Sequence, residues 1–279
     1  ANVLGIDASS FMVKLSKKKG VRSINAIFNY KESLKIKEKF GKSDIVIANN
    51  VFNHSDNPRI FLKGVHNLLK KNGMFIFEQP NFTTGLFSEK FDQIYHEHIS
   101  YFTKKNIKSI LEKSNFKIHE MYNNGYHGGS IRTIAVRKDS TLNEKNIQKD
   151  IIFENSKKIY SVNFYKKMFK KIDKKREILR DKINKLQKKG YVIAGIGAGA
   201  KANTFLTYFN LDSNALSFLT DSSKFKQNKY TPISRIIIKD DIEIRKYNKI
   251  ACIILSWNIS SLLIKKLKKI NNKINFIKI

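Results

Sequence analysis

The feature that most restricts the fold is a short apolar strand that runs into a glycine-rich turn and then a helix. Tyr191 to Ala194 predicts the strand, Gly-Ile-Gly-Ala-Gly-Ala-Lys follows at 195–201, and Ala202 to Phe209 predicts the helix. Glycines at such a turn let backbone N–H groups approach a phosphate, and the start of the helix adds a favourable dipole. The pattern predicts an α/β unit, in which ligands bind beyond the carboxyl ends of the strands.

The residues of this turn fit two interpretations. The spacing G-x-G-x-x-A, with Asp221 about 20 residues further on, is typical of a dinucleotide-binding site. Glycines are also required in tight turns that bind nothing. The turn alone leaves both interpretations open.

Strand and helix patterns alternate over the rest of the chain. Strands are predicted at 3–6, 24–28, 44–48, 74–77, 117–122, 130–138, 216–220, 250–255 and 275–279, and helices at 10–19, 33–40, 58–71, 103–114 and 260–269. The continuous apolar run at 44–48 predicts a buried parallel strand, and Gly73 predicts the end of the preceding helix. Alternation of this kind is typical of doubly wound sheets.

A long amphipathic pattern separates the two α/β regions. Apolar residues between Val162 and Leu186 recur at steps of three and four with lysines between them, which predicts one long helix that supports the domains. We therefore expect domains at 1–140 and 190–279, joined by a helical connector at 141–189.

The formal charge of +31 raises the question of a polyanionic partner. Only eight of the 54 basic residues are arginines, and the lysines are spread over the whole chain, whereas specific readers of bases and phosphates rely on arginine. We therefore expect no specific nucleic-acid partner, although an anionic nucleotide diphosphate would be attracted.

Other classes are excluded by what the composition lacks. No apolar run approaches the ~20 residues that span a bilayer, and the start shows no signal-peptide pattern. One cysteine, Cys252, excludes a disulfide scaffold and a multi-cysteine zinc site. We expect a cytoplasmic protein without membrane contact.

The densest group of titratable residues is Tyr95-His96-Glu97-His98, downstream of a predicted strand that ends in Glu78-Gln79-Pro80. Such a cluster beyond a strand end is a candidate site, and the alternative is a polar loop with its histidines in solvent. Asn50 and His54 follow the strand at 44–48, and a helical turn there would place both on one face.

Two further signals concern cofactors. Asp7 ends the first predicted strand, where an acid accepts hydrogen bonds from ribose hydroxyls in nucleotide-binding folds, or caps the following helix. His96 and His98 form a His-x-His pair, but the helical His-Glu-x-x-His spacing is absent, so we expect no metal site.

Three motifs in this order resemble those of the S-adenosylmethionine-dependent sugar C-methyltransferases, which methylate C-3 of nucleotide-linked 4-keto deoxysugars. The motifs are Tyr-His-Glu-His-Ile-Ser-Tyr-Phe at 95–102, Gly-Ile-Gly-Ala-Gly-Ala-Lys-Ala-Asn-Thr at 195–204 and Asp-Ser-Ser-Lys-Phe-Lys-Gln at 221–227. The resemblance runs over the whole chain. It implies an incomplete class I methyltransferase Rossmann-like sheet followed by a second Rossmann-like domain.

Parts of the family pattern have no counterpart in this chain. These are a cysteine-rich zinc domain, the first strand of the sheet and the glycine loop under the methyl donor. We therefore expect zinc only in a missing N-terminal domain, and either a fragment of a longer protein or a truncated chain.

The resemblance also implies the roles of individual residues. The expected catalytic residues are Tyr95, Glu97, His98, Asn50 and His54. Asp7 and Asn49 are expected to bind S-adenosylmethionine, and the residues expected to hold the nucleotide-sugar are Gly195, Gly197, Lys201 and Asn203.

The implied chemistry suits these residue types, because methylating carbon requires removal of a proton beside a ketone. His98, with an ordinary pKa near ~6.5, is the expected base, and Glu97 is expected to orient it. Tyr95, Asn50 and His54 would donate hydrogen bonds to the enolate oxygen. The alternatives are an NAD-binding oxidoreductase built on the Gly195 loop and a non-catalytic truncated remnant. The sequence leaves the oligomeric state open.

Overall fold

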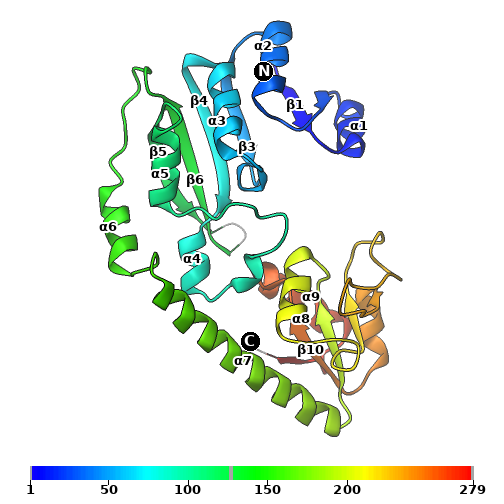
Figure 1. The fold of residues 1–279 in the computed structure, drawn as a ribbon. Coiled ribbons are helices and arrows are strands. Elements are labelled where there is room, and N and C mark those ends of the chain that lie inside the picture. Colours follow the sequence, from blue (N-terminus) through cyan, green and yellow to red (C-terminus); the bar gives the residue numbers. More distant parts are fainter. Residues whose placement is uncertain (1, 126–127, 278–279) are drawn as a thin grey trace. The chain divides into compact units, whose positions relative to one another are not determined.

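The computed structural model describes residues 2–125 and 128–277, and the chain divides into two compact units (Figure 1). Unit 1 comprises Ala1–Thr83 and Ile99–Lys157, and unit 2 comprises Thr84–His98 and Lys158–Ile279. The segment that carries Tyr95 and His98 therefore belongs to unit 2, although unit 1 surrounds it in the sequence. No helix in the described ranges has both the length and the apolar character needed to cross a membrane.

Unit 1 contains two separate sheets. The smaller one pairs two strands in parallel, and the larger has the order β3-β4-β6-β5, in which only β3 and β4 are parallel. The strands are β1 (Leu4–Asp7), β2 (Arg22–Asn25), β3 (Ser43–Asn49), β4 (Leu69–Pro80), β5 (Phe116–Asn124) and β6 (Ser130–Arg137). The predicted α/β class is confirmed.

The helices of unit 1 are α1 (Ser10–Lys18), α2 (Tyr30–Phe40), α3 (Pro58–Leu68), α5 (Lys104–Glu112) and α6 (Gln148–Ser156), whereas α4 (Phe82–Phe87) begins in unit 1 and has most of its residues in unit 2. Four helices of unit 1, α1, α2, α3 and α5, begin at a side-chain cap. Asn29, Asn57 and Thr103 each accept a backbone N–H bond from the first turn of the helix that follows. One core cluster of unit 1 packs rings such as Phe52, Phe61, Phe75, Phe77 and Phe116 between α3, α5 and one face of the sheet.

Two local predictions in unit 1 are wrong. Ile45 and Ile47 on β3 are exposed, so this strand is not buried on both faces. Gly73 does not end a helix, because β4 already begins at Leu69 and runs through it. A side chain at Gly73 would meet the carbonyl oxygens of Ser43 and Asp44 at 3.0 Å, so glycine there permits a close approach of two strands.

Unit 2 is built on a five-stranded parallel sheet of order β11-β10-β7-β8-β9 (Figure 1). The strands are β7 (Val192–Ile196), β8 (Phe218–Thr220), β9 (Ile238–Lys239), β10 (Ile250–Ile254) and β11 (Asn275–Ile277). β9 was not predicted, because two residues carry no periodicity. Residues 278 and 279, the end of the last predicted strand, lie outside the described residues.

The helices of unit 2 are α7 (Val162–Lys188), α8 (Ala200–Tyr208) and α9 (Ser260–Ile270). The predicted connector thus contains two helices, α6 in unit 1 and α7 in unit 2. Met168, Ile172, Leu179 and Ile183 are the buried residues of α7, and their spacing explains the amphipathic pattern.

Candidate functional site

His98 is held in a defined orientation by hydrogen bonds at both ring nitrogens. Its side chain is buried, with 8% of the residue exposed. Nδ1 lies 2.9 Å from the carbonyl oxygen of Gln93, and Nε2 lies 3.0 Å from the hydroxyl of Tyr95. Because a carbonyl oxygen only accepts, Nδ1 carries the proton and Nε2 accepts from the tyrosine O–H. The basic nitrogen of the imidazole therefore faces Tyr95.

A tight turn brings these two side chains together. The backbone N–H of His98 donates to the carbonyl oxygen of Tyr95 at 2.9 Å, and the two ring centroids are 4.2 Å apart. Glu97 is 53% exposed, and its carboxylate lies 3.9 Å from Nε2 of His96, which is 83% exposed. The orienting role that the sequence analysis gave to Glu97 is therefore performed by Gln93 and Tyr95. The alternative interpretation, a loop with its histidines in solvent, holds for His96 but not for His98.

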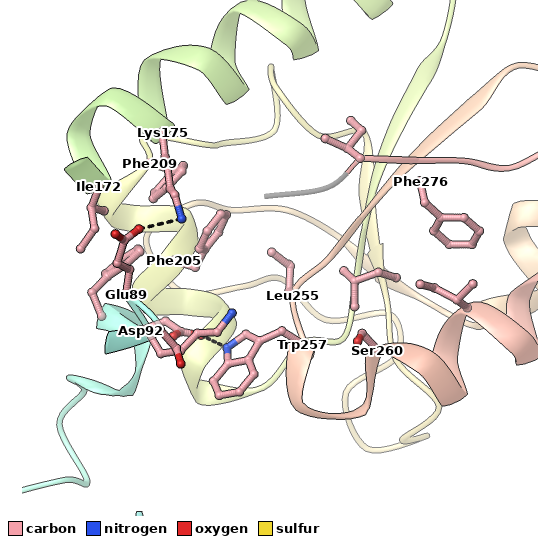
Figure 2. A pocket seen from close by; sticks show the side chains of 16 residues that line it. Glu89, Asp92, Ile172, Lys175, Phe205, Phe209, Leu255, Trp257, Ser260 and Phe276 are labelled. Atoms are coloured by element: carbon pink, nitrogen blue, oxygen red, sulfur yellow. Dashed lines mark hydrogen bonds and ion pairs between the residues drawn. The ribbon is translucent and has the colours of Figure 1, made fainter. Parts of the chain in front are cut away.

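The segment just before Gln93 is attached to the rest of unit 2 at three neighbouring residues (Figure 2). Glu89 forms an ion pair of 2.7 Å with Lys175 on α7, and Asp92 accepts a hydrogen bond of 2.5 Å from Nε1 of Trp257, which follows β10. The ring of Phe91 packs against three aromatic rings of the α8 region, Phe205, Tyr208 and Phe209. The sequence analysis missed these contacts, and no local pattern indicates them.

Asp7 and Asn49 lie at the carboxyl ends of β1 and β3 in unit 1, and both are exposed. Oδ1 of Asp7 accepts the backbone N–H of Ser9 at 2.7 Å, but the cap of α1 is Ser9 itself, whose hydroxyl accepts from Met12. The carboxylate of Asp7 thus fixes the turn and keeps an exposed Oδ2 that can accept a ribose hydroxyl.

Asn50 and His54 do not share a helical turn. Asn50 has a left-handed backbone, with φ of 51°, and its N–H donates to the carbonyl oxygen of Glu78 at 2.7 Å. His54 closes a short 3₁₀ helix that begins only at Phe52. The expected common face is therefore not formed, and each side chain is positioned separately after β3.

Glu78 at the end of β4 organises a polar group to which the sequence analysis gave no role. It is almost fully buried and accepts hydrogen bonds from the hydroxyl of Ser130 at 2.6 Å and from Arg132 at 2.7 Å. Burial raises the pKa of this carboxyl, but the bonds from Ser130 and Arg132 outweigh it and hold the pKa below its usual value. The Glu-Gln-Pro strand end was the available signal.

The glycines of the Gly195 loop have different tasks. Gly195 lies inside β7, where a Cβ would meet Leu219, Leu255 and Leu216, so the lack of a side chain serves the packing of the sheet. Its expected substrate contact stays a prediction. Gly197 has φ of +92°, and a Cβ there would collide with Oγ of Ser256, so this residue makes the turn possible.

Lys201 and Asn203 lie in the first turn of α8, whose N-cap Gly199 has no side chain to satisfy the helix N–H groups. The ammonium of Lys201 lies 5.0 Å from the ring centroid of Trp257, and burial lowers its pKa. A cation at a helix start forms part of an anion site.

Asp221 occupies the position that decides between the two interpretations of the loop. Its Oδ2 accepts the N–H of Ala198 at 3.0 Å and lies 3.2 Å from Nζ of Lys226. This acid is already bonded to the loop and to a lysine, so it is not held ready for the ribose of a dinucleotide. Within residues 2–125 and 128–277, no cluster of three or more metal-binding side chains was found.

Two family models match this chain. Residues 125–278 match the model of the C-methyltransferase C-terminal domain, and residues 1–121 match a methyltransferase domain. The chain is 26% identical to the C-methyltransferase NovU of Streptomyces niveus over 257 aligned residues. This alignment covers 92% of this chain and 61% of NovU. The chain thus spans about three fifths of the length of this relative.

Solved structures with a similar arrangement share little sequence. An S-adenosylmethionine-dependent methyltransferase from Anabaena variabilis is 14% identical, with a TM-score of 0.38, over 49% of this chain and 68% of its own. The magnesium protoporphyrin IX methyltransferase of Synechocystis is 20% identical, with a TM-score of 0.38, over 49% and 64%. The match of the C-terminal domain model to more than half of the residues shows that this chain belongs to the C-methyltransferase family.

Proposed function

We propose that the protein is an S-adenosylmethionine-dependent C-methyltransferase that acts on a nucleotide-linked keto-deoxysugar through an enolate. Membership of the family and the name of the relative NovU support transfer of a methyl group to carbon. The observation that carries the mechanism is the buried His98, whose Nδ1 lies against the carbonyl oxygen of Gln93 and whose Nε2 faces the hydroxyl of Tyr95. A cytoplasmic location stays a prediction.

His98 acts as the general base in this proposal. Its Nε2 removes the proton from the carbon beside the ketone, and the electrons of that C–H bond form the enolate. The Nδ1–H of His98 continues to donate its hydrogen bond to the carbonyl oxygen of Gln93. This bond stabilises the imidazolium that results. The proton then passes from His98 to solvent.

Tyr95 stabilises the enolate. In this structure its hydroxyl lies 3.0 Å from Nε2 of His98. In the proposed reaction the hydroxyl rotates toward the substrate oxygen and donates a hydrogen bond to the negative charge that develops there. Asn50 and His54 are further donors in the proposal. Glu97 lies exposed beside His96, so solvent would screen any electrostatic support that it gives to the charged form of His98.

The methyl donor and the nucleotide have separate residues. S-adenosylmethionine would supply the methyl group on positively charged sulfur: the C–S bond would break as the enolate carbon takes the methyl group, and S-adenosylhomocysteine would leave. Asp7 offers an exposed carboxylate oxygen to the ribose hydroxyls, and Asn49 offers an amide. Gly197, Lys201 and Asn203 hold the diphosphate of the sugar nucleotide.

The experiment incubates the protein with a methyl-labelled donor and a nucleotide-linked 4-keto-deoxysugar in deuterated water. We expect deuterium at the carbon beside the ketone, followed by gain of the labelled methyl group. His98→Ala should slow both by about 10²–10⁴, whereas His96→Ala, at the exposed histidine, should leave both unchanged. Protein that neither exchanges the hydrogen nor transfers the methyl group would refute the proposal.

The oxidoreductase alternative has its own test. NAD that raises the melting temperature while S-adenosylhomocysteine does not would favour it. The engagement of Asp221 with Ala198 and Lys226 speaks against this outcome.

A further inference from the structure

Basic side chains gather at the amino ends of three neighbouring strands in unit 2. In the order β11-β10-β7 the strands are parallel, so their amino ends meet at one edge of the sheet. Lys273 comes shortly before β11, Lys249 directly before β10 and Lys189 shortly before β7. Trp257 follows the other end of β10, so the edge with the lysines is opposite to the one that carries the Gly195 loop. We propose that this edge binds the phosphate backbone of a nucleic acid, whatever its sequence.

The end of α9 extends the same edge. This helix connects β10 to β11, so its last turn, which contains Lys268 and Lys269, leads to the amino end of β11. Arg245 is in the 3₁₀ helix at 241–246 that leads to β10. The residues of this basic edge come from three segments that are separate in the sequence, and they are Lys189, Arg245, Lys249, Lys268, Lys269 and Lys273. Folding therefore collects charges that look evenly spread along the chain.

A hollow with a volume of about 340 Å³ lies between this 3₁₀ helix and the end of α9. Asn271 joins these two elements, because its Nδ2 donates hydrogen bonds to the carbonyl oxygens of Ile244 at 3.1 Å and Tyr247 at 2.9 Å. Asn248 and Asn272 also line the hollow, and both are exposed. Side-chain amides of this kind donate hydrogen bonds to phosphate oxygens. The hollow can therefore receive a phosphate group between connected backbone elements and the cations around them.

The segments that build the basic edge contain no acidic residue. They are residues 184–191, 245–250 and 268–275. All six basic side chains are exposed. Within the described residues 2–125 and 128–277, none of the six pairs with a carboxylate, although the neighbouring Lys266 pairs with Asp241 at 2.5 Å. Cations held close together without a counter-ion repel one another, so phosphate groups that approach from outside are attracted.

The surface of the basic edge favours a nucleic acid over a membrane. In the same three segments, all of which the structure describes, no large apolar side chain is exposed. Helices that bind at a bilayer surface bury apolar side chains about 5–10 Å deep, and the basic edge offers none. A hollow also suits a strand of phosphates that can enter it, whereas a bilayer surface is flat on this scale. A duplex carries one negative charge per about 1.7 Å of its axis, so several phosphates face an edge of strands that lie about 4.8 Å apart.

The residue types of the basic edge indicate binding without recognition of bases. Apart from Arg245, all of its basic residues are lysines. A lysine ammonium is a compact point charge, whereas the forked guanidinium of arginine matches the edge of guanine. The affinity should therefore be equal for different sequences and should fall steeply as salt is added. This is consistent with the expectation that the chain has no specific nucleic-acid partner.

The test measures binding of the full chain to two short RNA duplexes of unrelated sequence, by fluorescence anisotropy at about 50 to 200 mM salt. One variant removes four charges from the basic edge, and its substitutions are Arg245→Gln, Lys268→Gln, Lys269→Gln and Lys273→Gln. The control removes four exposed charges from unit 1, and its substitutions are Lys14→Gln, Lys17→Gln, Lys18→Gln and Lys31→Gln. Both sets include two lysines in the last turn of a helix, α9 or α1, so the two variants lose the same net charge and the same support of a helix end.

The two variants should differ in both affinity and salt dependence. At about 50 mM salt the variant of the basic edge should bind about tenfold more weakly or worse, and the slope of log K against log salt should fall by about 3, because each lost phosphate contact removes about 0.7 to 0.9 from it. The control should stay within about threefold of the unmodified chain, since charges beyond the Debye length of about 10 Å are screened. Replacing Lys268, Lys269 and Lys273 by arginine keeps the charge and should keep the binding.

Melting temperatures equal to that of the unmodified chain are expected, since only exposed side chains are changed. Equal losses of affinity in the two glutamine variants would show that only the overall charge matters and would overturn the proposal. Absence of RNA binding by the unmodified chain, or a strong preference for one sequence, would overturn it as well. So would a variant of the basic edge that loses binding to vesicles containing phosphatidylglycerol but keeps binding to RNA. Methyl transfer is not measured, and the proposal does not rest on that reaction.

Discussion

The hydrogen bond between Tyr95 and His98 permits a sharp test of which residue takes the proton and which stabilises the enolate. The perturbation is Tyr95→Phe, which removes only the hydroxyl that lies 3.0 Å from Nε2. His98 keeps its bond of 2.9 Å to Gln93, so the ring keeps the attachment that sets its tautomer. The matched variant is His98→Ala, which removes the proton acceptor.

The expected magnitudes follow from these contacts. Loss of one hydrogen bond at a part-buried pair costs about 0.5–1.5 kcal/mol of stability, so the variant should fold. Loss of a donor to the enolate costs about 10²–10³ in kcat, or about 2.7–4 kcal/mol. Loss of the base costs about 10²–10⁴. Because the two side chains share one hydrogen bond, the double variant should be little slower than the worse single variant.

The assay follows exchange of the substrate hydrogen with deuterated water, first without and then with the methyl donor. Tyr95→Phe should slow exchange and methyl transfer by the same factor, because both pass through the enolate. His98→Ala should slow exchange by about 10²–10⁴. Exchange in Tyr95→Phe at the unmodified rate would show that the hydroxyl does not stabilise the enolate. Normal exchange in His98→Ala would show that another group takes the proton.

Three further predictions concern single residues. Gly197→Ala should lower the free energy of unfolding by about 1–3 kcal/mol, because φ of this residue is +92° and Oγ of Ser256 occupies the position of the added Cβ. The control is Gly199→Ala, whose Cβ would meet nothing within 4 Å and which should cost no more than ~0.5 kcal/mol. Chemical unfolding measures both. Folding lowers the pKa of Glu78 from its ordinary value of 4.5, so the ionised carboxyl stabilises the folded protein above that pH. This stabilisation is lost as the pH falls through the pKa of the folded state. The difference in unfolding free energy between Glu78→Gln and the wild type should therefore shrink below about pH 4. Asp7→Ala should weaken S-adenosylhomocysteine binding in calorimetry by about 5- to 150-fold and leave binding of the sugar nucleotide unchanged.

The sequence predicted the features that depend on neighbouring residues. The strand, glycine turn and helix at β7 and α8 follow from local periodicity and from a turn that requires glycine at Gly197. Asn57 and Thr103 lie at predicted helix starts because their side chains satisfy N–H groups within three residues. Gly73 misled the prediction because a glycine that ends a helix and one that permits close strand approach look alike in sequence.

The parts that could not be predicted depend on partners far apart in the chain. Asp92 and Trp257 are 165 residues apart, and neither stands in a motif that names the other. The sequence analysis expected the side chain of Glu97 to orient His98, because a sequence shows only which side chains are nearby. The group that accepts the Nδ1–H of His98 is instead the backbone carbonyl of Gln93. A backbone acceptor is set by the turn and not by residue identity.

This backbone acceptor explains why a segment enclosed by the first domain in sequence belongs structurally to unit 2. Gln93 can fix the tautomer of His98 only while its own carbonyl is fixed, and the two preceding residues supply that constraint. Phe91 packs on the rings of α8, and Asp92 bonds to Trp257 after β10. In the proposed mechanism, the parallel sheet of unit 2 would therefore position His98 as the base, through α8 and the end of β10. Changes at Trp257 should consequently alter the rate of proton removal even though this side chain has no part in the chemistry.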